Sequence, residues 1–370
     1  MTAPLKSQLR QAALRTRASA AVFGWDAQPG SLFLVTGGGE WAVKEIALGL
    51  EPNLAAGFEA VTILDQVTQR PYLSRANVHC LCRPAFFKGG GIQPLHRSNR
   101  LVVSWLHGGR HSDSPEIVAA CAQLERHWRK VRRFIVPNSR TLQDVLECGV
   151  DPRIVSVIPN GVNTRLFQPC PDPAHRDEVR RMLGIPPGAF VIGSFQRDED
   201  DAGAPKFVKG PDVLVAALAS AHRRTPVHAL LTGPTRRHVI EGLSRHGVPF
   251  THAQQSALTN MSQMYHALDA YCVSSREEGG PAPLRESMAS GVPVVSTRVG
   301  LAIDLIETGR NGFVVDVEDA DGLARHMSQL ADDAELGRRV AAMALDTVRA
   351  LDFSVIAQRY RAEVYREAFA

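Results

Sequence analysis

The sequence lacks the features that mark membrane, secreted and nucleic-acid-binding proteins. No apolar run approaches the roughly 18 residues that a membrane span needs, and the basic stretch at residues 1–25 has no apolar core of signal-peptide length. The formal net charge of +4 is too small and too dispersed to indicate nucleic-acid binding. We therefore expect a cytoplasmic protein without nucleic-acid partners.

Two further absences concern chemistry. The six cysteines include no CxxC pair and no histidine at a zinc-binding spacing, so we expect reduced, mostly buried thiols and neither a disulfide nor a metal site. The dinucleotide fingerprint GxGxxG is also missing, and Gly37-Gly38-Gly39 after the first strand is a weak substitute for it. A Rossmann-type oxidoreductase is therefore disfavoured.

The chain instead repeats an alternation of short apolar strands and helices over 370 residues, enough for two domains. Strands are predicted at residues 32–35, 61–64, 101–106, 134–136, 154–158, 190–195, 229–232, 270–274, 292–297 and 313–315. Residues 66–99 are predicted to be mostly loop and sheet edge. We expect two doubly wound, Rossmann-like α/β domains facing a cleft, at 1–160 and 161–350, with a helix at 351–370 packing back on the first domain.

The stretch from Tyr271 to Gly300 has the layout of a ligand site. Gly279, Gly280 and Pro281 break the chain after a strand, and Pro283 can open a helix that ends before the next strand. A helix that starts after a glycine turn presents free amides and the positive end of its dipole. Such a helix start can bind a phosphate.

Three side chains near strand ends are candidates for the chemistry. Glu278 and Glu286 lie eight residues apart, in the turn and early in the helix, and two carboxylates beside a phosphate site suit sugar hydroxyls. The alternative is that Glu286 only caps or charges the helix start, and this segment alone does not decide between them. His107 follows a strand and precedes two glycines, where open α/β sheets bind ligands.

Four motifs together resemble the retaining glycosyltransferases of family four (glycosyl transferases group 1), which have the GT-B fold. The motifs are VIPNGVNTRLF at 157–167, KGPDVL at 209–214, REEGGPAPLRESMASGVPVV at 276–295 and GRNGFVV at 309–315. The resemblance implies transfer of a sugar from a nucleotide diphosphate donor to an acceptor hydroxyl by a front-face mechanism. The acceptor would be a glycan, a lipid-linked molecule or a small molecule. Because no metal constellation is evident, we expect neither metal nor cofactor to take part.

The resemblance also assigns roles by position. Glu278 matches the glutamate that contacts the donor sugar, and Glu286 matches the one that holds the ribose. Arg197 and Lys209 match the basic pair on the donor diphosphate. His107 resembles a histidine near the donor sugar and is predicted, with Glu278, to be catalytic.

Main-chain donors are expected as well. Gly38 and its neighbours resemble a loop that approaches donor and acceptor together. Because Pro281 and Pro283 have no N–H, the turn's donor-binding amides are limited to those of Gly279, Gly280, Ala282 and Leu284.

Three positions depart from the family pattern. Eleven residues separate Arg197 from Lys209, more than is usual, so Lys206 is an alternative to Lys209. The acidic run 198–201 is predicted to be a solvated loop, with a metal site as the alternative. Leu301 stands where the family often has a second glycine.

Other functions stay open from the sequence. One is a nucleotide-sugar epimerase of the same fold, and another is a non-catalytic protein that binds nucleotide sugars. The basic stretch Arg126 to Arg133 is predicted to be a solvated face, with peripheral contact at the inner face of a membrane as the alternative if the acceptor is lipid-linked.

Overall fold

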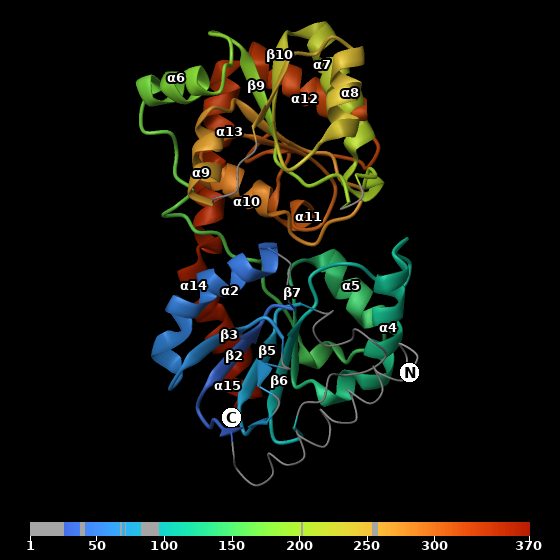
Figure 1. Cartoon of the computed structure of the whole chain (residues 1–370), viewed down its shortest axis with the longest axis vertical. Coiled ribbons are helices and arrows are strands. Elements are labelled where there is room, and N and C mark those ends of the chain that lie inside the picture. Colours follow the sequence, from blue (N-terminus) through green and yellow to red (C-terminus); the bar gives the residue numbers. More distant parts are fainter. Residues whose placement is uncertain are drawn as a thin grey trace. The chain divides into compact units, whose positions relative to one another are not determined.

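The computed structural model describes residues 26–37, 41–66, 69–70, 72–82, 96–200, 203–253 and 258–370, in two compact units (Figure 1). Unit 1 comprises Met1–Gly161 and Phe353–Ala370, and unit 2 comprises Val162–Asp352. Each unit contains a six-stranded sheet whose neighbouring strands are all parallel. The prediction of two parallel-sheet α/β domains is confirmed.

The large sheet of unit 1 has the strand order β3-β2-β5-β6-β7-β8, and β1 and β4 form a separate pair. The strands of this unit are β1 Asp26–Ala27, β2 Leu32–Val35, β3 Val61–Leu64, β4 Leu73–Ser74, β5 Asn77–Cys80, β6 Arg100–Ser104, β7 Arg133–Val136 and β8 Val155–Val157. Aliphatic side chains of β2, β6 and β7 are buried on both faces, as expected where helices cover both sides of a parallel sheet.

The helices of unit 1 come from both ends of the sequence. They are α2 Trp41–Leu54, α4 Pro115–His127, α5 Ser139–Glu147, α14 Phe353–Arg359, the π-helical turn Tyr360–Tyr365 and α15 Arg366–Ala368. The start of α5 is set by Asn138, whose side-chain oxygen accepts from the Thr141 amide at 2.8 Å. Helix α14 packs against α2, so the last segment of the chain, from Phe353 on, belongs to the unit of the first sheet (Figure 1).

Strand β5 corrects the prediction of loop and edge across residues 66–99, because it lies inside the sheet between β2 and β6. At its centre His79 is fully buried, with Nδ1 2.6 Å from Tyr365 Oη and Nε2 2.8 Å from Ser104 Oγ. Burial lowers the pKa of His79 to about 3, so it is a neutral core residue. The polar side chain interrupts the apolar pattern, and one of its partners lies 286 residues away.

Unit 2 has the strand order β11-β10-β9-β12-β13-β14. Its strands are β9 Phe190–Ser194, β10 Val227–Thr232, β11 Phe250–Ala253, β12 Ala270–Val273, β13 Val294–Thr297 and β14 Phe313–Val315. Its helices are α6 Pro173–Met182, α7 Pro211–Arg224, α8 Arg237–Arg245, α9 Leu258–His266, α10 Ala282–Ala289, α11 Ala302–Leu305, α12 Ala320–Asp332 and α13 Ala334–Val348.

The helices of unit 2 form two groups around the sheet. Helix α7 packs beside α8 and α12, and α10 packs beside α13 (Figure 1). Aliphatic side chains of α7 and α12 fill the core against β9, β10 and β12. Helix α6 and strand β11 were not predicted, because α6 buries only Val179 among its apolar residues and β11 has the polar pair Thr251-His252 at its centre.

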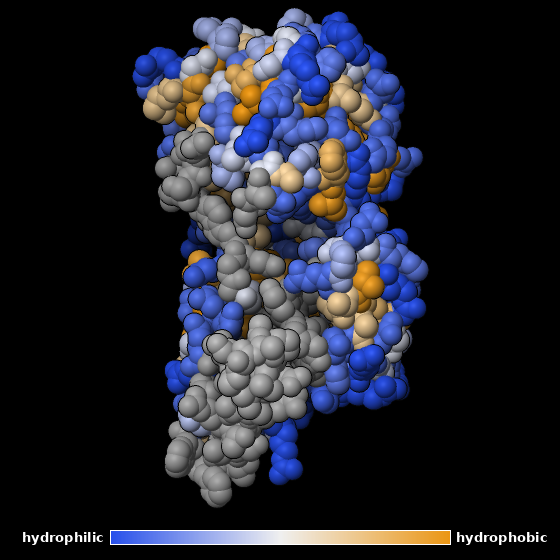
Figure 2. Space-filling model, turned by 45° about the vertical axis from the view of Figure 1, so that its right-hand side comes forward, coloured by the Kyte–Doolittle hydropathy of each residue, from blue (hydrophilic) through white to orange (hydrophobic). Residues whose placement is uncertain are grey.

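The visible surface is largely polar. In the space-filling view, hydrophilic residues cover most of the described part of that face, and apolar residues form separate small patches (Figure 2). Within the described residues, no helix has the length and apolar character required to span a bilayer.

Candidate functional site

The predicted site residues of unit 2 lie in loops at one edge of its sheet. Strands β9, β12 and β13 are parallel neighbours, so their carboxyl ends meet at that edge. The following loops contain Arg197 and Lys209 after β9, and Glu278 after β12. Open α/β sheets bind their ligands at this edge.

The glycine turn after β12 is held from two sides. Arg285, in α10, donates from Nη1 to the Gly280 carbonyl at 2.8 Å. At Gly300, in the loop after β13, a Cβ would lie 2.5 Å from the carbonyl oxygens of both Glu278 and Gly279, and its φ is +47°. Only glycine fits that approach without strain, so the turn has a defined position against the next loop.

The predicted amide donors of the turn are not equivalent. The Leu284 amide donates to the Pro281 carbonyl at 3.2 Å, so it is engaged within the first turn of α10. Pro281 supplies no side-chain cap to the helix. This bond counts against the predicted role of the Leu284 amide as a donor to the ligand.

Glu278 is anchored by two groups. Its Oε1 accepts from Lys209 Nζ at 2.7 Å and from Ser275 Oγ at 3.0 Å. Ser275 is itself fixed, because its carbonyl accepts from Thr297 Oγ1 at 2.6 Å. The Glu278 side chain is only 13% exposed, so its carboxylate has a defined direction at the strand edge.

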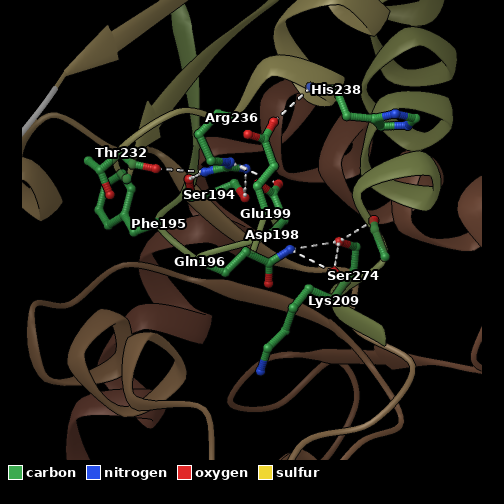
Figure 3. A network of polar contacts seen from close by, with 12 residues as sticks. Ser194, Phe195, Gln196, Asp198, Glu199, Lys209, Thr232, Arg236, His238 and Ser274 are labelled. Carbon is green, nitrogen blue, oxygen red and sulfur yellow. Dashed lines mark hydrogen bonds and ion pairs between the residues drawn. The ribbon is translucent and has the colours of Figure 1, made fainter. Parts of the chain in front are cut away.

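The backbone around Lys209 is fixed by its contact with β12. Gly210 has φ +61°, and a Cβ there would lie 2.0 Å from the Ser274 carbonyl oxygen. The Lys209 carbonyl accepts from Gln196 Nε2 at 2.8 Å. The side chain of Lys209 extends away from this anchored backbone (Figure 3) and reaches Glu278.

The structure brings Lys209, and not Lys206, to Glu278. The Lys206 amide donates to the Asp198 carbonyl at 2.7 Å, which closes the loop between the two residues. Arg197 lies on the same loop with its side chain exposed, directly after the buried Gln196. Gln196 bonds both Lys209 and Ser274, so it joins the loop after β9 to the end of β12 (Figure 3).

Asp198 and Glu199 of the acidic run are buried, which corrects the prediction of a solvated loop for these two residues; Asp200 is exposed, and Asp201 lies outside the described residues. Asp198 and Arg236 form a buried ion pair, with Oδ2 2.8 Å from Nε and both side chains 1% exposed. Arg236 Nη1 also donates to the carbonyls of Ser194 at 2.5 Å and Thr232 at 2.9 Å (Figure 3). Burial raises the pKa of Asp198, although Arg236 opposes the shift.

Glu199 has a structural role as well. Its Oε1 accepts from the His238 amide at 3.0 Å, at the start of α8 (Figure 3). Burial alone would raise the pKa of Glu199, but the bonds from Thr235, His238 and Arg237 lower it. Within the described residues, no three His, Cys, Asp or Glu side chains gather as a metal-binding group.

Glu286 does not cap the start of α10, which was one of the two structural roles left open by the sequence. Its Oε2 accepts from Tyr265 Oη at 2.7 Å, and the residue is 9% exposed. Burial raises the pKa of Glu286, while the Tyr265 bond and the nearby Arg285 charge lower it. Tyr265 was not predicted as a site residue, because a tyrosine in a half-apolar helix looks like any packing residue until its neighbours are known.

In unit 1 the structure describes one of the two predicted site residues. His107 is half-buried in the loop after β6, where the neighbouring Trp105 donates from Nε1 to the Gly108 carbonyl at 2.8 Å. That bond holds the loop at the carboxyl end of its strand. Gly38 lies outside the described residues.

Comparison with known proteins agrees with this arrangement. Residues 202–333 match the family model described as "Glycosyl transferases group 1". The chain is 27% identical over 293 residues to a D-inositol 3-phosphate glycosyltransferase of Corynebacterium glutamicum, covering 75% of this chain and 68% of that protein. It is 30% identical over 218 residues to the lipopolysaccharide core biosynthesis mannosyltransferase LpsB of Rhizobium meliloti, covering 56% and 58%.

Solved structures share the fold over nearly the whole chain. Anabaena Alr3699/HepE, whose structure is a complex with UDP, has a TM-score of 0.71 at 19% identity over 91% of this chain and 99% of that one. Sucrose-phosphate synthase from Thermosynechococcus elongatus has a TM-score of 0.70 at 15% identity over 92% and 99%. Residues 202–333 thus form a group 1 glycosyltransferase domain, and the chain that carries it is a glycosyltransferase of the GT-B fold.

Proposed function

We propose that this glycosyltransferase moves a sugar from a nucleoside diphosphate donor to an acceptor hydroxyl with retention of configuration and without a metal ion. The observation that carries the proposal is the Lys209–Glu278 pair at the carboxyl ends of β9 and β12, with Nζ and Oε1 2.7 Å apart. It places a cation suited to a phosphate beside a carboxylate suited to sugar hydroxyls.

The proposed roles are those that the resemblance to the family implies, and the positions of the groups at the sheet edge support them. Glu278 accepts hydrogen bonds from the donor sugar, and Glu286 accepts from the ribose. Lys209 and Arg197 bind the diphosphate, because fixed cations can stabilise the charge that develops on a leaving phosphate. The amides of Gly279, Gly280 and Ala282 add main-chain donors at the start of α10, where the helix dipole favours an anion.

The reaction needs no protein nucleophile. The bond between the sugar C1 and the β-phosphate oxygen breaks while the acceptor oxygen bonds to C1 on the same face, and the acceptor proton moves to the departing phosphate. The protein contributes orientation and charge stabilisation. His107, in the other unit, is proposed to act near the donor sugar.

The relatives indicate which substrates to test first. HepE was crystallised with UDP and with UDP-glucose, so UDP-sugars are the first donors to test. The names of two relatives refer to D-inositol 3-phosphate and to lipopolysaccharide core biosynthesis. We therefore propose a hydroxyl on a polyol phosphate or a glycan as the acceptor.

The experiment that tests the proposal follows the anomeric configuration of the product. Thermal-shift measurements with UDP-, GDP-, ADP- and dTDP-sugars select the donor, and proton NMR of the product then reports the configuration at C1. We expect the donor's configuration to be kept and the rate to be unchanged by EDTA. An inverted product, or activity that EDTA abolishes and Mn²⁺ or Mg²⁺ restores, would overturn the mechanism. Conversion of the donor to another nucleotide sugar without acceptor would indicate an epimerase.

Contact with a membrane is a further part of the proposal. Arg126, Arg129, Lys130 and Arg132 are exposed around the end of α4. Clusters of this kind bind anionic lipid surfaces. A peripheral position at the inner face of a membrane would give the enzyme access to a lipid-linked acceptor.

A further inference from the structure

The hydroxyl of Tyr265 is directed at the carboxylate that is proposed to hold the ribose. Tyr265 lies in α9, 21 residues before Glu286 in α10, and the Oη–Oε2 distance is 2.7 Å. The tyrosine is 0% exposed, so this is a buried hydrogen bond to a buried carboxylate. Hydrogen bonds to charged groups are about twice as strong as neutral ones when water is excluded.

The tyrosine ring has little freedom to move. Its centroid lies 5.0 Å from that of Phe195, 5.7 Å from that of Phe167 and 5.9 Å from that of Tyr271. Phe195 directly follows β9, and Phe167 belongs to the motif VNTRLF at 162–167. The aromatic cluster therefore fixes the position of the hydroxyl before any ligand binds.

We propose that Tyr265 is a positioning residue that holds the Glu286 carboxylate charged and oriented for nucleotide binding, an inference that rests on the proposed ribose-binding role of Glu286. A carboxylate that accepts from two neighbouring hydroxyls must present its oxygens in a fixed plane. One oxygen held at 2.7 Å by a rigid phenol restricts the orientation of that plane.

The same bond favours the ionised form of Glu286 in a poorly solvated place, where burial raises its pKa. The groups that act on its pKa are Tyr265 from α9 and Arg285 from α10, both of which favour the carboxylate, and burial, which opposes it. Tyr271 from β12 is also close enough to be affected by the Glu286 charge. Removing the Tyr265 hydroxyl takes away a donor to the charged form, so it raises the pKa of Glu286 further.

A change in pH dependence follows from this shift. The proposed ribose contact uses the carboxylate, and protonation of Glu286 on acidification removes its charge and weakens it as an acceptor. If its pKa is higher, affinity for the nucleotide is lost at a higher pH as the solution is acidified. The nucleotide's own phosphate titration is the same for every variant, so it cancels in the ratio between variant and wild type.

The test is the Tyr265→Phe substitution, which removes the hydroxyl and keeps the ring in its cluster. Calorimetric titration with UDP, GDP, ADP and dTDP identifies the nucleotide that binds the wild-type chain, and its Kd is then measured from pH 5 to 8. We expect an affinity loss of about 10-fold at neutral pH. We also expect the acid limb of the pH profile, the range in which affinity falls on acidification, to shift to higher pH. Unchanged affinity and an unchanged limb would overturn the inference, even if the variant melts at a lower temperature.

Tyr271→Phe is the matched control. Tyr271 belongs to the same buried cluster, but its Oη accepts from the Phe195 amide at 2.8 Å and does not bond Glu286. Its loss should lower the melting temperature without moving the acid limb. If Tyr271→Phe moved the limb as far as Tyr265→Phe did, the effect would be one of packing, and the positioning role would be rejected.

A second variant separates this inference from the function on which it rests. Glu286→Gln keeps the shape of the side chain and removes its charge. If Glu286→Gln binds the nucleotide as tightly as wild type, the ribose-binding role itself is wrong. If Glu286→Gln loses affinity while Tyr265→Phe retains it, the proposed function stands and only the positioning role fails.

Discussion

Lys209 lies against Glu278 at a strand edge, and the energetic value of this pair for folding is small. The lysine side chain is 29% exposed and that of the glutamate 13%, so water weakens their attraction. The pairing matters because it holds an ammonium group where a diphosphate is proposed to bind. A cation already in place does not have to be reoriented as the charge of the leaving group develops.

We expect Lys209→Met to lower turnover by roughly 10²–10³, the usual cost of removing one preorganised charge stabiliser. Lys206→Met is the matched control, since Lys206 is held to the loop through its amide and is not the lysine that reaches Glu278. Steady-state kcat/KM with the selected donor checks both variants. A larger loss for Lys206→Met than for Lys209→Met would transfer the role to Lys206.

Single residues also show what the sequence could predict about the site. Glu278 and Lys209 were predicted because each stands in a recognisable motif, Glu278 in the turn after β12 and Lys209 just before α7. Their ion pair was not predicted, since 69 residues separate them and only the fold joins β9 to β12. Tyr265 carried no pattern at all, because its role depends on the direction of one hydroxyl.

At the level of elements, the loop after β9 is shaped by charges that looked solvated. Asp198 pairs with Arg236, and Glu199 receives the amide of His238 at the start of α8. Arg236 has φ +61°, an uncommon conformation for a residue with a side chain. The loop that contains Arg197 is thus tied to the end of β10 through buried polar contacts.

Arg236→Met should destabilise the protein by about 3–5 kcal/mol, because it leaves the Asp198 carboxylate buried without its cation. Arg236→Met combined with Asp198→Leu should be less destabilised than the single variant, since no buried charge remains. The free energy of unfolding in urea measures both. Arg237→Met, at the exposed neighbouring position, is the control and should change stability by no more than about 0.5 kcal/mol. A double variant less stable than Arg236→Met would contradict the electrostatic explanation.

The elements that were predicted correctly share a physical cause. Strands such as β2, β9 and β13 are buried on both faces and consist almost wholly of apolar or β-branched residues, so their composition identifies them. Strands β5 and β11 each contain a histidine with polar partners, which hides them from such a pattern. The sequence pattern therefore identifies a strand whose residues are apolar. It does not identify a strand whose polar side chains are bonded to residues far away in the sequence.

At the scale of the whole molecule, the surface feature to explain besides the donor site is a group of basic residues at the end of α4, called here the basic face. Arg126, Arg129, Lys130 and Arg132 are exposed, and the Arg129 guanidinium lies 4.4 Å from the centre of the Trp128 ring. Arg133 is different, because it donates to the carbonyl of Arg153 at 2.8 Å and lies 3.3 Å from the Glu367 carboxylate. Arg133 therefore stabilises unit 1, and four exposed cations remain for a surface.

We expect the protein to float with vesicles that contain anionic lipid at low salt and to be released at high salt, because the attraction between exposed charges is screened. Each basic residue near such a surface contributes about 1 kcal/mol, so reversing two of them, Arg129→Glu with Arg132→Glu, should weaken binding by more than about 10-fold. Arg223→Glu with Arg224→Glu is the control. These two arginines are an exposed basic pair at the end of α7 in the other unit, so the double variant makes the same change in net charge and should leave most of the binding intact.

If both pairs weaken flotation equally, only net charge matters and the basic face is not a docking site. If the wild-type chain does not float at low salt, it has no membrane-binding face, and a lipid-linked acceptor would have to be presented in another way.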